Sequence, residues 1–403
     1  MLLYIGKEIN MKYIGTISRG IKAPIIRSGD DLVEITVDSI KKAVKEDNIV
    51  LHDKDIVAVT EAVIAKSQGN FAKVDDIAKD VRAKLGEGTI GLIFPILSRN
   101  RFSNILKGIA KGCDKIILQL SYPFDEVGNP LVSIDRLYEL GITNFNKTYS
   151  EKQFYNIVGK IEHPFTGMDY IKLYKDICGK NCKIILSNDP TTILKYTKKV
   201  ITADIHSRFR NKDVLLKNGA EKVIGLHEIL NKSIDGSGFN EKYGVLGSNL
   251  STDDTLKLFP RDTQSFVDRL QKRLIEETGV KMECMVYGDG AFKDPVGGIW
   301  ELADPVVSPA YTSGLEGTPN EIKLKYIADN KIGNLTGENA VIAMKQIISQ
   351  KSKDLKNKNE SLGTTPRRLT DLLGSLSDLT SGSGDKGTPI VLITGYFNNY
   401  ADD

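Results

Sequence analysis

Between residues 89 and 231, short apolar runs alternate with helical stretches, and this alternation constrains the fold more than any other feature of the 403-residue chain. Four runs have the character of buried strands, at 90–94, 115–120, 182–186 and 200–204. Three stretches have helical spacing, at 102–110, 169–177 and 213–218. Strands that alternate with helices typically form a parallel sheet with crossover helices. The sequence therefore predicts the α/β fold class.

Polar loops follow these strand-like runs, at residues 98–101, 121–125, 187–190 and 204–208. Open parallel sheets bind ligands outside the carboxyl ends of their strands, so we expect a small-molecule role for this region. The loops contain no glycine-rich dinucleotide fingerprint. His163, His206 and His227 are expected to be loop or packing residues rather than catalysts.

Another strand-like run lies outside this region, at residues 282–287, and ends at Gly288-Asp289-Gly290. A carboxylate is thus delivered at a strand end, on backbone that glycine tolerates well. Two interpretations stay open, a metal or phosphate site on Asp289 and an ordinary hairpin turn.

The helix predicted at 263–278 precedes this strand and carries Phe266, Leu270 and Leu274 on one face, with Gly279 as its C-terminal cap. Further helices are predicted after it, at 320–330, 338–351 and 369–379.

Two other segments are candidates for phosphate binding. Lys66 lies in residues 61–69, directly after the apolar run 56–60, and is either a phosphate ligand or a solvated surface lysine. The Gly/Ser-rich loop 381–389 opens onto the strand-like run 390–394. Its backbone N–H groups suit phosphate oxygens, although such loops are as often linkers or turns.

Charge and composition restrict the partners. Lys and Arg number 55 against 52 Asp and Glu, and the basic residues are scattered, so nucleic acid is not expected to bind. No apolar run is long enough to span a bilayer and the first residues lack a signal peptide's pattern, so we expect a cytoplasmic protein that binds no membrane.

The chain has four cysteines, and this low number agrees with the expected cytoplasmic location. Cys178 and Cys182 have the spacing of a metal clip, but no second Cys or His pair accompanies them. No zinc site is therefore predicted.

In their order along the chain, these motifs resemble the coenzyme F420-0:L-glutamate ligase (gamma-glutamyl ligase) family. The resemblance rests on five elements: residues 24–32, 55–69, 247–249, the turn at Asp289, and 384–393. It covers about the first 85 residues and everything from about residue 243 onward.

The resemblance implies a ligase that uses GTP, or ATP, with Mg²⁺ or Mn²⁺. Such an enzyme activates an acceptor carboxylate as an acyl phosphate, which the amino group of L-glutamate attacks to form an amide. It implies that Lys66 and Asp289 are catalytic and that Asp289, Gly290 and Asp385 bind metal. The implied nucleotide contacts are Ala23, Pro24, Ile25, Ile26, Glu61, Ala62, Lys66, Asn249, Ser381, Gly382, Ser383, Gly384, Asp385, Lys386, Gly387 and Thr388.

Three positions depart from the family's pattern. Leu246 stands where the family has a metal-binding aspartate, and Ser383 stands where it has a second acid, so Asp385 would have to take that role. Residues 292–298 stand where family members that act on the deazaflavin have a basic, Gly-Arg-rich run. The acceptor is therefore F420-0-like or, alternatively, of the folate type. A third alternative is a nucleotide- or small-molecule-binding protein without catalysis.

We predict a mixed α+β ligase-like core formed by residues 11–88 and 243–403, interrupted by an inserted parallel α/β domain at 89–242. The resemblance also implies a homodimer.

Overall fold

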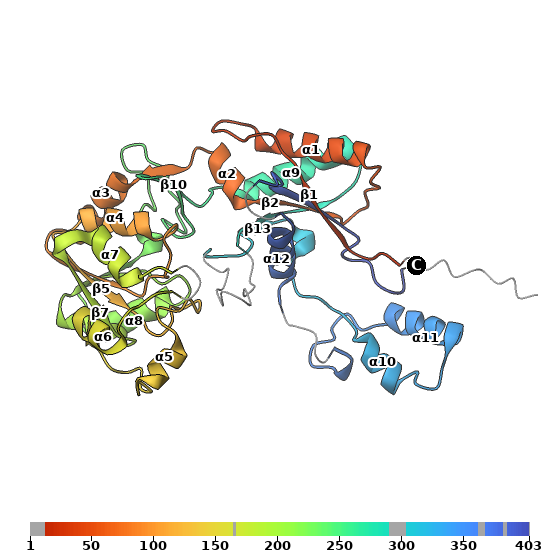
Figure 1. The fold of residues 1–403 in the computed structure, drawn as a ribbon. Coiled ribbons are helices and arrows are strands. Elements are labelled where there is room, and N and C mark those ends of the chain that lie inside the picture. The colour runs from red at the N-terminus through yellow and green to blue at the C-terminus, as the bar shows by residue number, and fades with distance from the viewer. Residues whose placement is uncertain (1–12, 164–166, 290–303, 362–366, 382–384, 403) are drawn as a thin grey trace, which may run out of the picture.

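The computed structural model describes residues 13–163, 167–289, 304–361, 367–381 and 385–402. Figure 1 shows two lobes that each contain a sheet, joined near α2 (Glu61–Ser67), and a separate pair of helices near the C-terminus. Within the described ranges, no helix has the length and apolar character needed to cross a bilayer. The fold is α/β, as the sequence predicts.

A five-stranded sheet forms the centre of one lobe. Its strands, in spatial order, are β1 (Ile17–Ile21), β14 (Ile390–Thr394), β2 (Ile56–Thr60), β12 (Glu283–Tyr287) and β13 (Ala310–Tyr311). β2 and β12 are parallel, with Thr60 opposite Tyr287, whereas the other neighbours are antiparallel. The two central strands therefore end at the same edge of the sheet.

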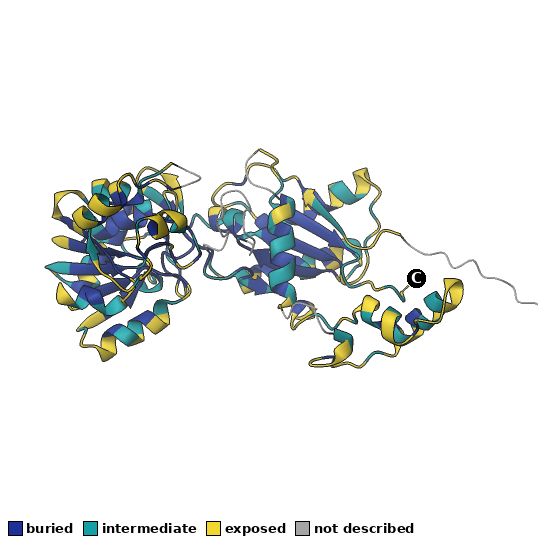
Figure 2. Cartoon of the chain, turned by 60° about the horizontal axis from the view of Figure 1, so that its bottom comes forward, coloured by how far each residue is buried: buried dark blue, intermediate teal, exposed yellow. Residues whose placement is uncertain are grey.

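Helices cover both faces of this sheet. Val57 and Val59 pack in one hydrophobic cluster with α1 (Leu32–Glu46) and α9 (Thr263–Thr278), whereas Ile56 and Ala58 pack in another with α12 (Leu369–Ser381). Successive side chains of a strand point to opposite faces, so a strand covered on both sides needs an unbroken apolar run. Figure 2 shows these strands buried between partly exposed helices.

The second lobe contains a six-stranded sheet. Its strands, in spatial order, are β6 (Tyr149–Ser150), β7 (Cys182–Leu186), β5 (Lys115–Leu120), β4 (Thr89–Ile93), β8 (Lys199–Thr202) and β9 (Lys222–Gly225). Five strands are parallel, namely the four predicted runs and β9, which was not predicted, and the short edge strand β6 is antiparallel.

The helices of this lobe are α3 (Val74–Leu85), α4 (Ser103–Lys111), α5 (Ile134–Glu139), α6 (Glu151–Val158), α7 (Tyr170–Cys178) and α8 (Arg208–Lys217). Residues of α3, α4 and α7 share a hydrophobic core with one face of the sheet, and Leu215 of α8 packs on the other. The same core includes Leu256 and Phe259 from a small sheet of β10 (Asn249–Thr252), β11 (Thr255–Lys257) and β3 (Phe71–Lys73).

Two helices near the C-terminus, α10 (Leu324–Asn330) and α11 (Gly337–Ser349), have a small cluster of their own around Ile327, Met344 and Ile348. The prediction that a helix begins at residue 320 is wrong. Asn320 instead bonds through its side chain to Ser352 and Leu355, which fixes the segment to the neighbouring loop.

Other predicted boundaries also need correction. β4 ends at Ile93 rather than at Phe94, because Phe94 has φ 54°, a left-handed conformation that no strand accommodates. α8 begins at Arg208, five residues before the predicted start. β8 ends at Thr202 rather than at residue 204, and α11 ends at Ser349 rather than at residue 351.

Candidate active site

The parallel strands β2 and β12 deliver two acids to one edge of the five-stranded sheet. Glu61 directly follows β2, and Asp289 follows β12 after a single glycine. The Asp289 N–H donates to Oδ2 of Asp304 at 2.8 Å. A Cβ on Gly288 would lie 2.3 Å from that same Oδ2, so glycine is required for the close approach of Asp304.

Arg101 connects this edge to the other lobe. It lies in the loop after β4, and its Nη1 and Nη2 donate to Asp304 at 2.8 Å and to Asp289 at 2.5 Å. The Asp304 side chain is only 1% exposed, while those of Arg101 and Asp289 are 18% and 22% exposed. Burial lowers the pKa of the guanidinium, but Asp304, Asp289 and Glu61 outweigh this effect and raise it overall. Arg101 therefore stays cationic between two carboxylates.

Lys257 is the counter-ion of Glu61. Its Nζ lies 2.9 Å and 3.2 Å from the two carboxylate oxygens, and both side chains are largely buried. Burial raises the pKa of the Glu61 carboxyl, and the positive charge of Lys257 opposes that rise. Lys257 is in turn the cross-strand partner of Asn249, so the predicted nucleotide contact Asn249 lies beside the Glu61 pair.

Together these five side chains form one charge network of three carboxylates and two cations, in which Glu61 interacts electrostatically with Asp304 and Arg101. Among the described residues, no group of three or more His, Cys, Asp or Glu is arranged to hold a metal ion. The pair Asp289 and Asp304 nevertheless offers two carboxylates, and Mg²⁺ is commonly bound by one or two carboxylates together with substrate phosphates.

The predicted nucleotide segments lie partly side by side. The N–H of Ala23, which begins the predicted stretch 23–26, donates to the carbonyl of Gly387 at 3.2 Å. The Thr388 hydroxyl donates to the carbonyl of Ser381 at 2.7 Å. These bonds bring the segment after β1 against the loop before β14.

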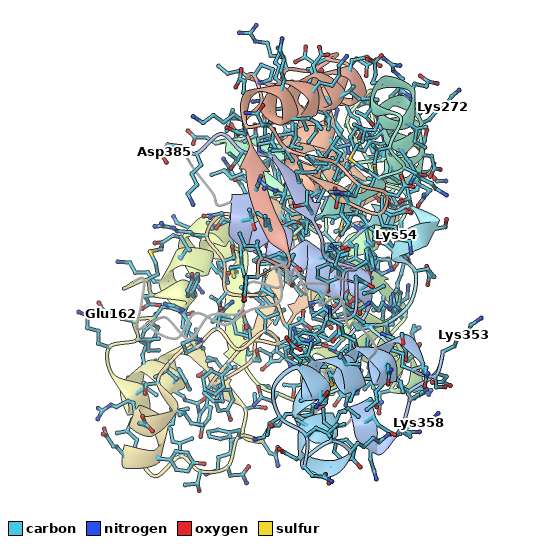
Figure 3. All side chains as sticks on the ribbon, turned by 90° about the vertical axis from the view of Figure 1, so that its right-hand side faces the viewer. Lys54, Glu162, Lys272, Lys353, Lys358 and Asp385 are labelled. Atoms are coloured by element: carbon cyan, nitrogen blue, oxygen red, sulfur yellow. The ribbon has the colours of Figure 1, made fainter. Side chains whose placement is uncertain are left out.

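Other predicted residues lie farther from the charge network. Asp385 and Lys386 are exposed, and the Asp385 side chain projects from the surface of the molecule (Figure 3). Lys66 is exposed in the last turn of α2, whereas Ala62 follows Glu61 in its first turn. Gly290, Gly382, Ser383 and Gly384 lie outside the described residues.

Sequence reasoning missed three members of the network: Arg101, Lys257 and Asp304. Arg101 stands in a loop that follows a predicted strand, which was a usable signal. Nothing local marks Lys257 or Asp304, because the charged partners Glu61 and Arg101 lie 196 and 203 residues away along the chain.

Comparison with known proteins identifies the family of the chain. No curated protein matches the sequence. The model of the family described as F420-0:gamma-glutamyl ligase matches residues 20–395, a span that includes both lobes and all five residues of the charge network. The chain therefore belongs to the F420-0:gamma-glutamyl ligase family, whose reaction is of the ligase type.

Proposed function

We propose that the protein is a nucleotide- and divalent-metal-dependent gamma-glutamyl ligase that adds L-glutamate to a carboxylate of a cofactor-like acceptor. The observation that carries the proposal is the convergence of Glu61, Asp289 and Asp304 at the shared end of β2 and β12, in a chain of this family.

The reaction proceeds in two steps. An oxygen of the acceptor carboxylate attacks the terminal phosphorus of GTP or ATP, and the bond to the leaving nucleoside diphosphate breaks. The glutamate amine then attacks the acyl carbon of the acyl phosphate, the bond to phosphate breaks, and the nitrogen loses its proton. Both steps gather negative charge, which cations and fixed N–H donors stabilise.

Asp289 and Asp304 would hold the Mg²⁺ or Mn²⁺ ion, and Asp385 would serve as a further ligand. The bound ion would neutralise phosphate charge. Arg101 and Lys257 supply positive charge beside the acids through the bonds that they already make. Residues 23–26 and 385–388 would position the nucleotide, and Lys66 would contact a phosphate.

A second candidate is a binding protein on the same scaffold, without catalysis. The observation that favours it is Arg101, whose guanidinium already neutralises both carboxylates. Leu246, which is buried and apolar where the family has an acid, supports it as well.

Calorimetry with GTP and ATP, with and without Mn²⁺, separates the two candidates from a protein that binds no nucleotide. For either candidate we expect metal-dependent nucleotide binding. Asp289→Ala should weaken it by at least about tenfold, which corresponds to about 1.4 kcal/mol. Asp235→Ala, which removes a carboxylate that is 69% exposed, is the matched control. Unchanged binding in Asp289→Ala, or no binding in the wild type, contradicts the proposal.

Turnover then distinguishes the ligase from the binding protein. Mass spectrometry of reactions with L-glutamate and a panel of carboxylate acceptors should detect an acceptor that has gained one glutamyl residue, with release of nucleoside diphosphate. Nucleotide binding without such a product across the panel favours the binding protein.

A further inference from the structure

Two cysteines face each other where α7 ends and β7 begins. Cys178 is the last residue of α7, and Cys182 is the first residue of β7. Gly179 ends the helix in the left-handed region, with φ 69°, and a short turn at Gly179–Asn181 leads the chain back to the sheet. Both cysteines are free, and their thiols hydrogen-bond to each other. The chain reversal therefore places two reduced thiols in contact.

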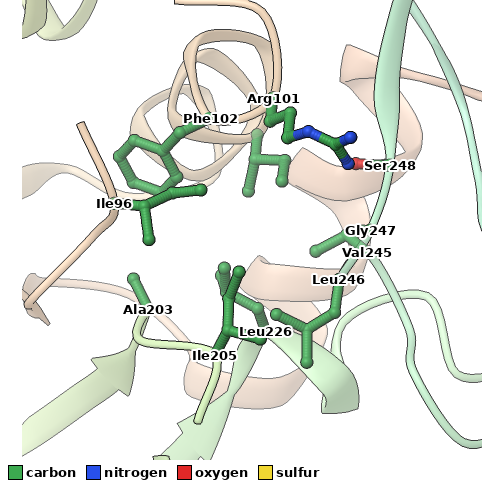
Figure 4. Close-up of a pocket in the computed structure, with 11 residues that line it drawn as sticks. Ile96, Arg101, Phe102, Ala203, Ile205, Leu226, Val245, Leu246, Gly247 and Ser248 are labelled. Atoms are coloured by element: carbon green, nitrogen blue, oxygen red, sulfur yellow. The ribbon is translucent and has the colours of Figure 1, made fainter. Parts of the chain in front are cut away.

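Both ends of this reversal are held in fixed positions. Tyr174 lies one turn before Cys178 on α7 and is fully buried. Its hydroxyl donates to the carbonyl of Ile96 at 3.0 Å, and its ring packs edge-on against Phe102. Figure 4 shows Ile96 and Phe102 in the segment that follows β4. Cys182 is paired with β5 across the sheet. Packing on both sides thus keeps the two sulfur atoms together.

The pair differs in acidity from the other cysteines. The hydrogen bond between the thiols lowers the pKa of Cys182 and raises that of Cys178, so Cys182 loses its proton first. Burial opposes this effect at Cys182, and the positive charge of Lys175, whose Nζ donates to the Cys182 carbonyl at 2.7 Å, adds to it. Burial raises the pKa of Cys113 to about 11 and that of Cys284 well above its usual range. Because the thiolate is the reactive form, the pair should meet an oxidant before the other two cysteines do.

The pair can be reached from one side. Cys178 is half-buried and the turn 179–181 is exposed, whereas Cys182 is only 5% exposed. A small oxidant therefore fits the site better than a bulky one. The exposed turn makes no part of the core, so it can adjust when the two sulfur atoms are joined.

We propose that Cys178 and Cys182 are a redox site, at which hydrogen peroxide converts the two thiols into a reversible disulfide. The thiolate of the pair attacks one oxygen of the peroxide, the O–O bond breaks, and the released hydroxide takes up a proton to become water. The remaining thiol attacks the sulfur of the resulting sulfenic acid, so that the S–S bond forms, the S–O bond breaks and a second water leaves with the thiol's proton. The two thiols are oxidised and the peroxide is reduced to water. This site is independent of the proposed ligase reaction.

Mass spectrometry of the full chain, treated with hydrogen peroxide under native conditions, alkylated and digested without reductant, tests the proposal. Trypsin cleaves after Lys180, between the two cysteines, so a disulfide is needed to hold peptides 176–180 and 181–183 together. We expect these linked peptides, and we expect dithiothreitol to separate them. They should form at least about tenfold faster than any oxidation product of Cys113 or Cys284, because the thiolate fraction governs the rate.

Cys178→Ser should abolish the linked peptides. Cys113→Ser is the matched control, because Cys113 packs against the same hydrophobic core as Cys178, and it should leave them unchanged. Absence of the linked peptides in the wild type, a disulfide from Cys113 to Cys182, or equal oxidation rates at all four cysteines overturns the proposal. These wild-type results decide the proposal even if Cys178→Ser does not fold.

Discussion

Both large sheets have acidic residues at the carboxyl ends of their strands, but the groups that contact these acids differ between the two sheets. At the end of β2 and β12, Glu61, Asp289 and Asp304 face the cations Lys257 and Arg101. In the second lobe, Asp125 follows β5 and Asp204 follows β8, and both are buried.

The acids of the second lobe accept hydrogen bonds from neutral groups. Asp125 accepts from backbone N–H groups and from Asn129, and Asp204 accepts from Asn211. Burial raises the pKa of Asp125 to about 6 and that of Asp204 to about 7, where the charge of Glu126 adds to the effect. At both edges burial raises the pKa of a carboxyl; at Glu61 the charge of Lys257 opposes that rise, whereas at Asp125 and Asp204 only hydrogen bonds from neutral groups oppose it.

The largest expected effect comes from removing a cation at the charged edge. Lys257→Met leaves Glu61 buried without a counter-ion, which should lower the free energy of unfolding by about 3 kcal/mol at pH 8. Because the folded-state pKa of an unpaired buried carboxyl is raised, the loss should shrink as the pH falls and Glu61 takes up a proton. Urea denaturation at pH 8 and pH 5 measures both. An equal loss at the two pH values would show that packing, rather than charge, is responsible.

The second lobe should make the free energy of unfolding fall with rising pH. Asp204 has a pKa of about 7 when folded, against about 4 when unfolded, so the native state holds the extra proton between these values. The Asp204 proton alone should therefore lower stability by roughly 2.7 kcal/mol between pH 5 and pH 8, about two pKa units at ~1.36 kcal/mol each, and Asp125 should add about half as much. Asp204→Asn should flatten this dependence in urea denaturation. Asp235→Asn, an exposed acid, should leave it unchanged.

A steric change should weaken the charged edge by a smaller amount. Gly288→Ala places a Cβ against Asp304 and should cost about 1 to 2 kcal/mol through local displacement. Gly15→Ala is the control, because nothing lies within 4 Å of its added Cβ. Thermal melting of the two variants compares them, and equal melting temperatures would contradict the close contact.

Surface ion pairs should matter least. Lys107 and Asp254 form a pair whose side chains are 45% and 73% exposed. Lys107→Met should change the free energy of unfolding by less than about 0.5 kcal/mol. The same urea denaturation measures this change. If Lys107→Met lowered the free energy of unfolding as much as Lys257→Met does, burial would not explain why the two ion pairs differ in strength.

Local pattern was sufficient to predict many elements. The helix at residues 263–278 has the predicted bounds and Gly279 ends it in the left-handed conformation, because an amphipathic period and a glycine cap act over a few residues. The alternating strands and helices correctly indicated a largely parallel sheet. The predicted start of α10 at residue 320 was wrong, because the side chain of Asn320 bonds to residues more than thirty positions away.

By itself, the sequence determined the fold class, most strands and helices, the family, and the delivery of Asp289 at a strand end. Only the tertiary structure decided what surrounds Asp289. Arg101 comes from the second lobe and Asp304 from the segment after β12, and Lys257 reaches Glu61 from the small sheet. The physical reason is the distance along the chain over which each effect acts. Periodicity and capping act between near neighbours in the sequence. Ion pairs and pockets instead depend on which distant segments the packed sheets bring together.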